Sequence, residues 1–274
     1  MANPAVAPAT DAAEFEDEII VDNRKLSMLD VAAPFVTFVI LLLVWEGAAV
    51  YFSVPSWLLP APTEIAKAFV EWRGELWYHS LVTLYETLAG FALSIVLAIP
   101  LAVMIVFSPI LRKCIYPLLL GLQSVPKVAI APLLALWIGF GVLPKILVVF
   151  LVCFFPIVVS TATGLASVSP AVMDLIRSLS ASKLQTFIKI RFPTAVPHIF
   201  VGLKIAITFA VIGAVIGEFV GAESGLGYLI LASSSQARTP VAFAALVVLT
   251  ILSIVLFYLM ELIERLAVPW AVNE

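Results

Sequence analysis

Charged residues are scarce in this chain of 274 residues: Asp, Glu, Lys and Arg make up 12% of it, against 63% hydrophobic residues. A water-soluble domain cannot bury so large a share of apolar surface, so the composition indicates an integral membrane protein. The apolar stretches are continuous rather than alternating, which favours a helical bundle over a β-barrel.

Cysteine and histidine are nearly missing as well, with two of each. Cys114 and Cys153 are expected at a cytosolic helix end and inside a span, positions that do not favour a disulfide. His79 and His198 lack Cys or His neighbours at ligand spacing, so no metal site is expected. No Gly-Lys dipeptide occurs, which excludes ATP binding by a P-loop in this chain.

Three regions are expected along the chain. Residues 1–30 are rich in Ala, Asp and Glu and lack the basic start and apolar core of a signal peptide, so they are predicted to form an acidic cytoplasmic tail. Residues 31–264 form the predicted transmembrane domain, and 265–274 a short cytoplasmic tail.

Six membrane spans are predicted, giving an all-α polytopic fold, at about 31–50, 81–107, 115–140, 145–165, 196–220 and 241–262. The third is interrupted at 123–127, so we expect one discontinuous span whose break faces protein or a cavity. A short amphipathic helix, capped by Thr63, is expected before the second span.

Lys and Arg residues set the expected orientation. With the N-terminus in the cytoplasm, nine lie inside and four outside. The inside set is Arg24, Lys25, Arg112, Lys113, Arg177, Lys183, Lys189, Arg191 and Arg265, and the outside set is Lys67, Arg73, Lys145 and Arg238. Both termini are therefore predicted to be cytoplasmic.

The segment 167–195 is the most polar stretch between apolar ones, and it carries helix signals. Ser169 can cap a helix that has Pro170 at its first position, and Pro193 is expected to stop the helix before it continues through Phe192. An apolar stripe recurs at i, i+3, i+4 and i+7, formed by Val172, Leu175, Ile176 and Leu179. Periodicity alone leaves two interpretations open: a surface that binds a soluble partner, or a stripe that packs on the chain's own helix ends.

Four stretches together carry a family resemblance. They are PSWLLPAPTEI (55–65), SVPKVAIAPLLALWIGFG (124–141), DLIRSLSASKLQTFIKIRFP (174–193) and EFVGAESGLGYLI (218–230). The chain resembles the permease subunit of a bacterial ABC importer, in the branch with sulfonate, taurine, nitrate and bicarbonate permeases. The family's loop pattern is Glu-Ala-Ala, three residues, Gly, nine residues, Ile, any residue, Leu-Pro; here Asp174, Leu175 and Ile176, then Ser180, Ile190 and Phe192-Pro193 occupy its places.

This resemblance implies a MetI-like, type I importer bundle with a cytoplasmic coupling helix that docks on an ATPase. The implied docking residues are Val172, Asp174, Leu175, Ile176, Arg177, Leu179, Ser180, Lys183, Ile190 and Pro193. The implied partners are a second permease copy (a homodimer), two cytosolic ABC ATPases that bind ATP and Mg, an external solute-binding protein and membrane lipid, with no nucleic acid and no cofactor on this chain. The implied location is the bacterial inner membrane.

Ser180 departs from the family pattern, which has Gly at this place. Since Gly adopts left-handed conformations cheaply and Ser does not, we expect a more continuous helix here than a sharp corner. The departures at Asp174, Leu175, Ile176 and Ser180 bear on the geometry of ATPase docking.

Two groups of polar or small residues are candidates for the translocation path or for helix packing: Gln123, Ser124 and Lys127, and Gly213, Gly217, Glu218 and Gly221. Unwound backbone and a lysine suit an anionic solute, whereas Lys127 also has the length to snorkel or to pair with a carboxylate. The glycines, four residues apart, indicate close helix packing, either within the chain or at a permease–permease interface. Glu218 is expected to form an ion pair, with Lys145 or Arg238 as partner, or to contact solute.

The predicted function is a non-catalytic permease that forms the path for a sulfonate, taurine, nitrate or related anion. The alternative solute is heteroaromatic or vitamin-like, such as an aminopyrimidine, riboflavin or an aromatic acid. A secondary transporter driven by an ion gradient is the alternative of another class; it would need ion-coupling carboxylates at mid-membrane and inverted repeats, and the sequence shows neither feature clearly. An intramembrane enzyme would need a catalytic constellation, which the sequence lacks.

Overall fold

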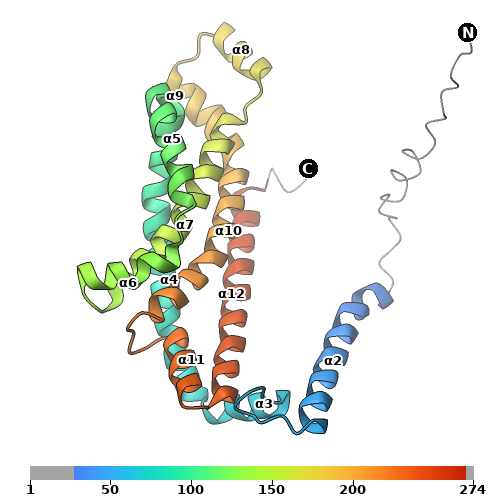
Figure 1. The fold of residues 1–274 in the computed structure, drawn as a ribbon. Helices are drawn as coiled ribbons and strands as arrows, with labels where there is room; N and C mark the ends of the chain where they lie inside the picture. The colour runs from blue at the N-terminus through green and yellow to red at the C-terminus, as the bar shows by residue number, and fades with distance from the viewer. Residues whose placement is uncertain (1–27, 270–274) are drawn as a thin grey trace, which may run out of the picture. The chain divides into compact units, whose positions relative to one another are not determined.

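The computed structural model describes residues 28–269, all of whose regular structure is helical (Figure 1). The described chain divides into two units, one ending at Phe52 and the other beginning at Ser53. The acidic patch of the predicted N-terminal tail and the last five residues lie outside the described range.

The helices are α2 (Met28–Tyr51), α3 (Pro62–Glu71), α4 (Arg73–Phe107), α5 (Pro109–Gln123), α6 (Lys127–Ile138), α7 (Val142–Ala166), α8 (Pro170–Ser178), α9 (Lys183–Thr186), the π-helical turn η2 (Phe187–Arg191), α10 (Phe192–Glu218), α11 (Leu226–Ser235) and α12 (Thr239–Ala267).

The first unit contributes the single apolar helix α2, which matches the first predicted span. Its large side chains are exposed on all sides, including Phe35, Leu43 and Tyr51. A helix that is apolar all round is suited to lipid or to another membrane helix.

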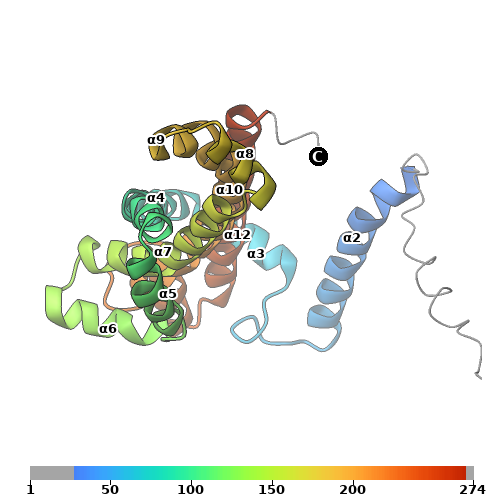
Figure 2. The same cartoon turned by 90° about the horizontal axis from the view of Figure 1, so that it is seen from above.

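The second unit is built around α7, which packs most extensively on α10 and then on α4. Seen along the long helices, α4, α7, α10 and α12 group together (Figure 2). Its core consists mainly of small and β-branched residues, such as Val149, Ile157 and Ala206, which let the helices approach closely.

Five helices are long and apolar enough to cross a membrane, and a sixth span results if the bent pair α5–α6 counts as one. The predicted break is confirmed: α5 ends at Gln123, α6 begins at Lys127, and the two are bent by 96°.

Three predicted boundaries are wrong. The second span begins at Arg73 rather than near 81, because aromatic and polar residues before the apolar run continue the same helix. The short helix before it begins at Pro62, and the Glu64 carboxylate accepts the Ala61 N–H (3.2 Å), so Thr63 is not its cap. The interval 221–240, left between the fifth and sixth predicted spans, contains the helix α11, whose ten residues are too few for a clear period.

Candidate functional site

The segment 167–195 forms a helix, a sharp corner and a second helix at one end of the unit (Figure 1). Ser169 caps α8 as predicted, with its hydroxyl oxygen accepting the Val172 N–H (3.4 Å) and Pro170 following. Leu175 and Leu179 are 60% and 72% exposed, whereas Ile176 is buried. The apolar stripe is thus divided: Ile176 packs on the chain itself, and its neighbours face outward.

The corner after α8 corrects the expectation for Ser180. Its φ is 53°, in the left-handed region, so the helix does not continue. The Ser180 N–H donates to the Arg177 carbonyl (3.0 Å) and the Ala181 N–H to the Ile176 carbonyl (3.3 Å), which is a Schellman motif. These bonds satisfy two helix-end carbonyls and offset a conformational cost of about 1–2 kcal/mol for a non-glycine residue.

The helix that follows corrects the expectation for Pro193. Ser182 and Gln185 form a capping box at the start of α9 (2.9 and 3.2 Å), and the helix then runs unbroken through η2 into α10. In η2 the Phe192 N–H reaches back to the Phe187 carbonyl, one residue further than in an α-helix. This wider turn and the position of Pro193 at the start of α10 accommodate a ring that would break a regular α-helix.

The structure brings only some of the predicted docking residues together. A groove of about 480 Å³ is lined by Ile176, Leu179, Ser180 and Ile190, among others. Asp174 and Arg177 form an exposed ion pair (3.0 Å) on α8 outside that groove. Val172 and Lys183 are exposed, and Lys183 begins α9.

At the break between α5 and α6, Gln123 and Ser124 are exposed and Lys127 is half-buried. The Lys127 ammonium donates to the Gln123 carbonyl and lies 5.5 Å from the centre of the Phe155 ring. Among residues 28–269 it therefore pairs with no carboxylate, and it does not extend away to snorkel: it bridges the break and contacts α7.

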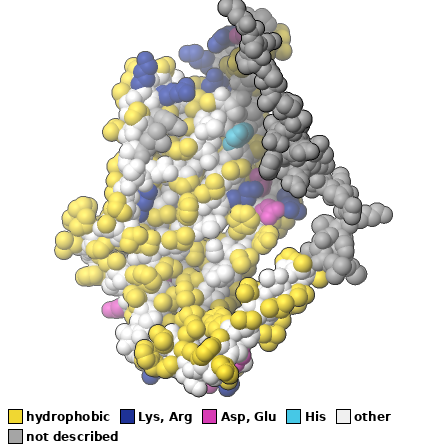
Figure 3. Space-filling view, turned by 45° about the vertical axis from the view of Figure 1, so that its right-hand side comes forward, with side chains coloured by type: hydrophobic (Ala, Val, Ile, Leu, Met, Phe, Trp, Pro, Cys, Tyr) yellow, Lys and Arg dark blue, Asp and Glu magenta, His cyan; other side chains and the backbone are white. Residues whose placement is uncertain are grey.

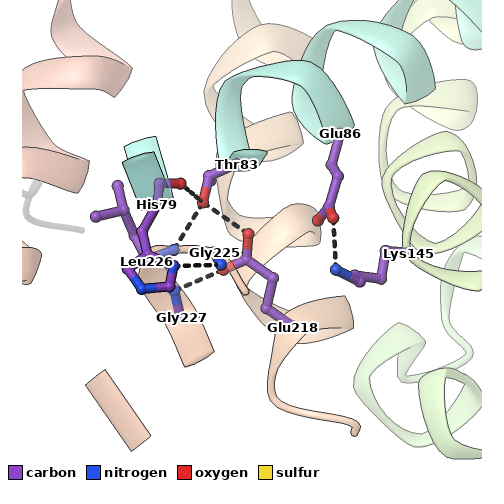
Figure 4. A network of polar contacts seen from close by, with 8 residues as sticks. All are labelled: His79, Thr83, Glu86, Lys145, Glu218, Gly225, Leu226 and Gly227. Atoms are coloured by element: carbon purple, nitrogen blue, oxygen red, sulfur yellow. Dashed lines mark hydrogen bonds and ion pairs between the residues drawn. The ribbon is translucent and has the colours of Figure 1, made fainter. Parts of the chain in front are cut away.

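A buried polar cluster joins α4, α7, α10 and the turn before α11 (Figure 4). Glu218, 1% exposed, accepts hydrogen bonds from the Thr83 hydroxyl (2.6 Å) and the Gly227 N–H (2.5 Å). Thr83 in turn accepts the Leu226 N–H (2.8 Å). The Gly225 N–H donates to Nδ1 of His79 (2.9 Å), so a neutral His79 carries its proton on Nε2.

The predicted ion pair of Glu218 with Lys145 or Arg238 is wrong. Lys145 pairs with Glu86 at 2.5 Å, both side chains being almost fully buried. Arg238 lies 5.5 Å from the Trp72 ring centre. Glu218 is bound by neutral donors because the first turn of α11 places the Gly227 N–H beside it and α4 places the Thr83 hydroxyl there.

Two glycines make this arrangement sterically feasible. Gly225 has a φ of 116°, and a Cβ there would overlap the Glu218 carboxylate. A Cβ on Gly227 would lie 2.8 Å from Oε2 of Glu218. Thr83, Glu86, His79 and these glycines were not selected from the sequence; a Gly-x-Gly motif seven residues after a membrane carboxylate was the available signal.

Gly213 and Gly217 provide close packing within the chain. A Cβ on either would lie 3.0 Å from a Cα of α7, that of Val149 and of Lys145 respectively. Gly221 lies beyond α10 with a φ of 71°, against the Phe140 ring. The hypothesis that the Gly213–Gly217 face meets a second permease is therefore wrong, since α7 already occupies it.

Within residues 28–269, no three His, Cys, Asp or Glu side chains gather as a metal-ligand set. The described chain instead combines the capped helix α8, the broken membrane helix α5–α6 and the buried polar cluster around Glu218. Residues 90–270 match the family model described as the binding-protein-dependent transport system inner membrane component.

The chain belongs to this family.

Individual relatives support the same assignment. This chain is 35% identical to the formylaminopyrimidine transport permease protein ThiX of Halalkalibacterium halodurans, over 86% of this chain and 95% of the relative. It is 34% identical to the riboflavin transport system permease protein RibX of Chloroflexus aurantiacus, over 86% and 88%. It is 29% identical to the putative aliphatic sulfonates transport permease protein SsuC of Bacillus subtilis, over 84% of both.

A solved structure shows the fold. The inward-facing MetNI methionine ABC transporter matches with a TM-score of 0.59 and 21% identity, covering 68% of this chain and 92% of that chain. The protein is thus a MetI-like permease subunit of an ABC importer, without catalytic activity of its own, and a separate ATPase subunit hydrolyses ATP.

Proposed function

We propose that two copies of this permease assemble with two cytosolic ATPases and an external solute-binding protein, and that α8 is the element gripped by the ATPase. The observation that carries this proposal is α8 itself: a short helix with both ends capped, presenting Leu175 and Leu179 outward. Exposed apolar side chains one turn apart suit insertion into a groove of a partner. Arg177 and Lys183 then contact the rim of that groove, and ATP and Mg bind in the ATPase.

The connections of α8 suit the transmission of movement. On one side only Ser167–Ser169 separate it from α7, and on the other the corner at Ser180 leads into the continuous helix α9–η2–α10. Because α7 and α10 pack along each other, a displacement of α8 acts on both helices.

The proposed path runs beside the broken helix α5–α6, where α5 ends at Gln123 and Ser124 is the first residue beyond it. Non-helical backbone at membrane depth is tolerated where it faces protein or a water-filled cavity. In the proposed orientation α8 and both termini lie in the cytoplasm, and the chain resides in the inner membrane among lipid.

A heteroaromatic solute is favoured over a sulfonate-type anion. The relatives named for formylaminopyrimidine and riboflavin share 35% and 34% of aligned residues with this chain, against 29% for the relative named for sulfonates. The single lysine at the break is already engaged by the Gln123 carbonyl and the Phe155 ring, which lessens its availability to an anion.

The test is a Leu175→Asp variant, expressed with its ATPase and binding protein and reconstituted in vesicles. A charge on this exposed residue should weaken ATPase co-purification at least about tenfold, as expected for loss of a buried anchor, and should abolish ATP-dependent uptake. Leu266→Asp, at a still more exposed apolar position on α12, is the control. Wild-type vesicles should take up a labelled aminopyrimidine in preference to taurine.

Undiminished co-purification and uptake by Leu175→Asp would remove α8 from the docking role. Uptake that persists without ATP and follows an ion gradient would contradict ATP-driven import. A preference for taurine would leave the docking role intact and return the solute to the sulfonate class.

A further inference from the structure

A separate pocket lies at the end of the unit that carries α8, where four elements meet. It has a volume of about 610 Å³ and is lined by the last turn of α4, including Ile105, by Arg112 at the start of α5, by residues at the end of α7, and by Arg191 of η2. It shares no lining residue with the groove beside α8, and it is distinct from the buried cluster.

The pocket carries two positive charges that pair with no carboxylate of the described part of the chain. Among residues 28–269, neither Arg112 nor Arg191 forms an ion pair. The acidic side chains in this half of the unit bind other cations: Asp174 with Arg177 (3.0 Å), Glu261 with Arg265 (2.6 Å) and Glu264 with Lys204 (2.7 Å). Lys and Arg side chains gather visibly at this end (Figure 3).

The carbonyl groups at the helix ends around the pocket are partly satisfied by hydrogen bonds, which lessens their repulsion of an anion. The Gly164 carbonyl near the end of α7 accepts both the N–H (3.2 Å) and the hydroxyl (2.8 Å) of Ser167. The Met104 carbonyl of α4 accepts the Ser108 N–H (3.1 Å). In addition α5 begins here, so the positive end of its dipole is directed toward this end of the unit.

We propose that this pocket binds the phosphate group of an anionic phospholipid. Guanidinium groups bind phosphate oxygens through paired hydrogen bonds, and basic pockets between membrane helices are typical sites for lipid headgroups. The lining is divided: Arg112, Arg191 and the Thr163 and Ser167 hydroxyls are polar, whereas Ile105 and its apolar neighbours suit glycerol and the first acyl carbons. The pocket lies where the spans α4 and α7 end, and one free phosphate would leave most of its volume empty.

The experiment is native mass spectrometry of the full chain in detergent with phosphatidylglycerol, phosphatidylcholine or inorganic phosphate added. The wild type should retain one phosphatidylglycerol in preference to phosphatidylcholine. The double variant Arg112→Ala/Arg191→Ala should bind phosphatidylglycerol at least about tenfold more weakly, since two charge-assisted contacts are lost. Arg265→Ala, an arginine outside the pocket, should bind as the wild type does.

Equal retention of both lipids by the wild type, or unchanged phosphatidylglycerol binding by the double variant, would overturn the proposal. Displacement of the lipid by inorganic phosphate would assign the site to the free anion. A double variant that keeps the lipid but loses its ATPase would assign the arginines to the protein partner. If the alanine variant does not fold, Arg112→Lys/Arg191→Lys keeps the charges but loses the paired geometry, and it should bind phosphatidylglycerol with reduced affinity.

Discussion

Thr83 joins two buried groups that come from distant parts of the chain. Its hydroxyl donates to Glu218 and accepts the Leu226 N–H, so one small side chain connects α4 to both α10 and the start of α11. Thr83→Val keeps the shape but leaves both groups without this partner. Each unsatisfied buried group costs about 1–3 kcal/mol, and we expect the melting temperature of the purified permease to fall by on the order of 10 °C.

The control for this prediction is Thr208→Val on α10. The Thr208 hydroxyl donates to the Lys204 carbonyl of its own helix (3.1 Å), a group that keeps its backbone partner without it. A thermal scan should show little change for this variant. Equal melting temperatures for the two variants would mean that the tie through Thr83 contributes nothing to stability.

The corner after α8 gives a prediction at the scale of the element. Ser180 has a left-handed backbone, which costs a non-glycine residue about 1–2 kcal/mol. Ser180→Gly should therefore stabilise the corner and slow amide hydrogen exchange in α8. Ser178→Gly, the same change two residues earlier inside the helix, should destabilise α8 by up to about 1 kcal/mol and accelerate exchange. Faster exchange in Ser180→Gly than in the wild type would contradict this account.

Elements with strong local signals could be predicted from the sequence. Ser169 and Pro170 marked the start of α8, and the long apolar runs marked α2, α7, α10 and α12. The predictions for Ser180 and Pro193 were wrong, because each applied a rule about a single residue type where neighbouring hydrogen bonds allow a different backbone conformation. Ser180 adopts a glycine-like backbone because a Schellman motif supports it, and Pro193 continues a helix because a π turn precedes it.

The contacts between distant segments could be predicted least. Glu218 was singled out from the sequence, but its donors come from α4 and from the first turn of α11, which periodicity does not place in space. Glu86 was not selected as a site residue, because a span that begins near residue 81 places it close to the end of that span. Once α4 extends to Arg73, Glu86 lies well inside the helix and opposite Lys145.

For the molecule as a whole, the Glu86–Lys145 pair places opposite charges between α4 and the first turn of α7. Lys145→Met removes the only cation of this described cluster and leaves Glu86 buried beside Glu218. A buried charge that loses its partner costs about 3–5 kcal/mol, whereas replacing both partners is often nearly neutral. We therefore expect Lys145→Met to lower the folded yield and melting temperature sharply, and Glu86→Gln/Lys145→Met to recover most of both.

Glu86→Gln, Lys145→Met and the double variant form a double-mutant cycle that measures the interaction energy of the two side chains. The packing of Gly217 on the Lys145 backbone does not enter this energy, because the substitutions leave it in place. A double variant no more stable than Lys145→Met would show that the lysine acts through its aliphatic packing rather than through its charge. Recovery of folding would instead show that the Lys145 ammonium stabilises the contact of α4 with α7 mainly by compensating the buried Glu86 carboxylate.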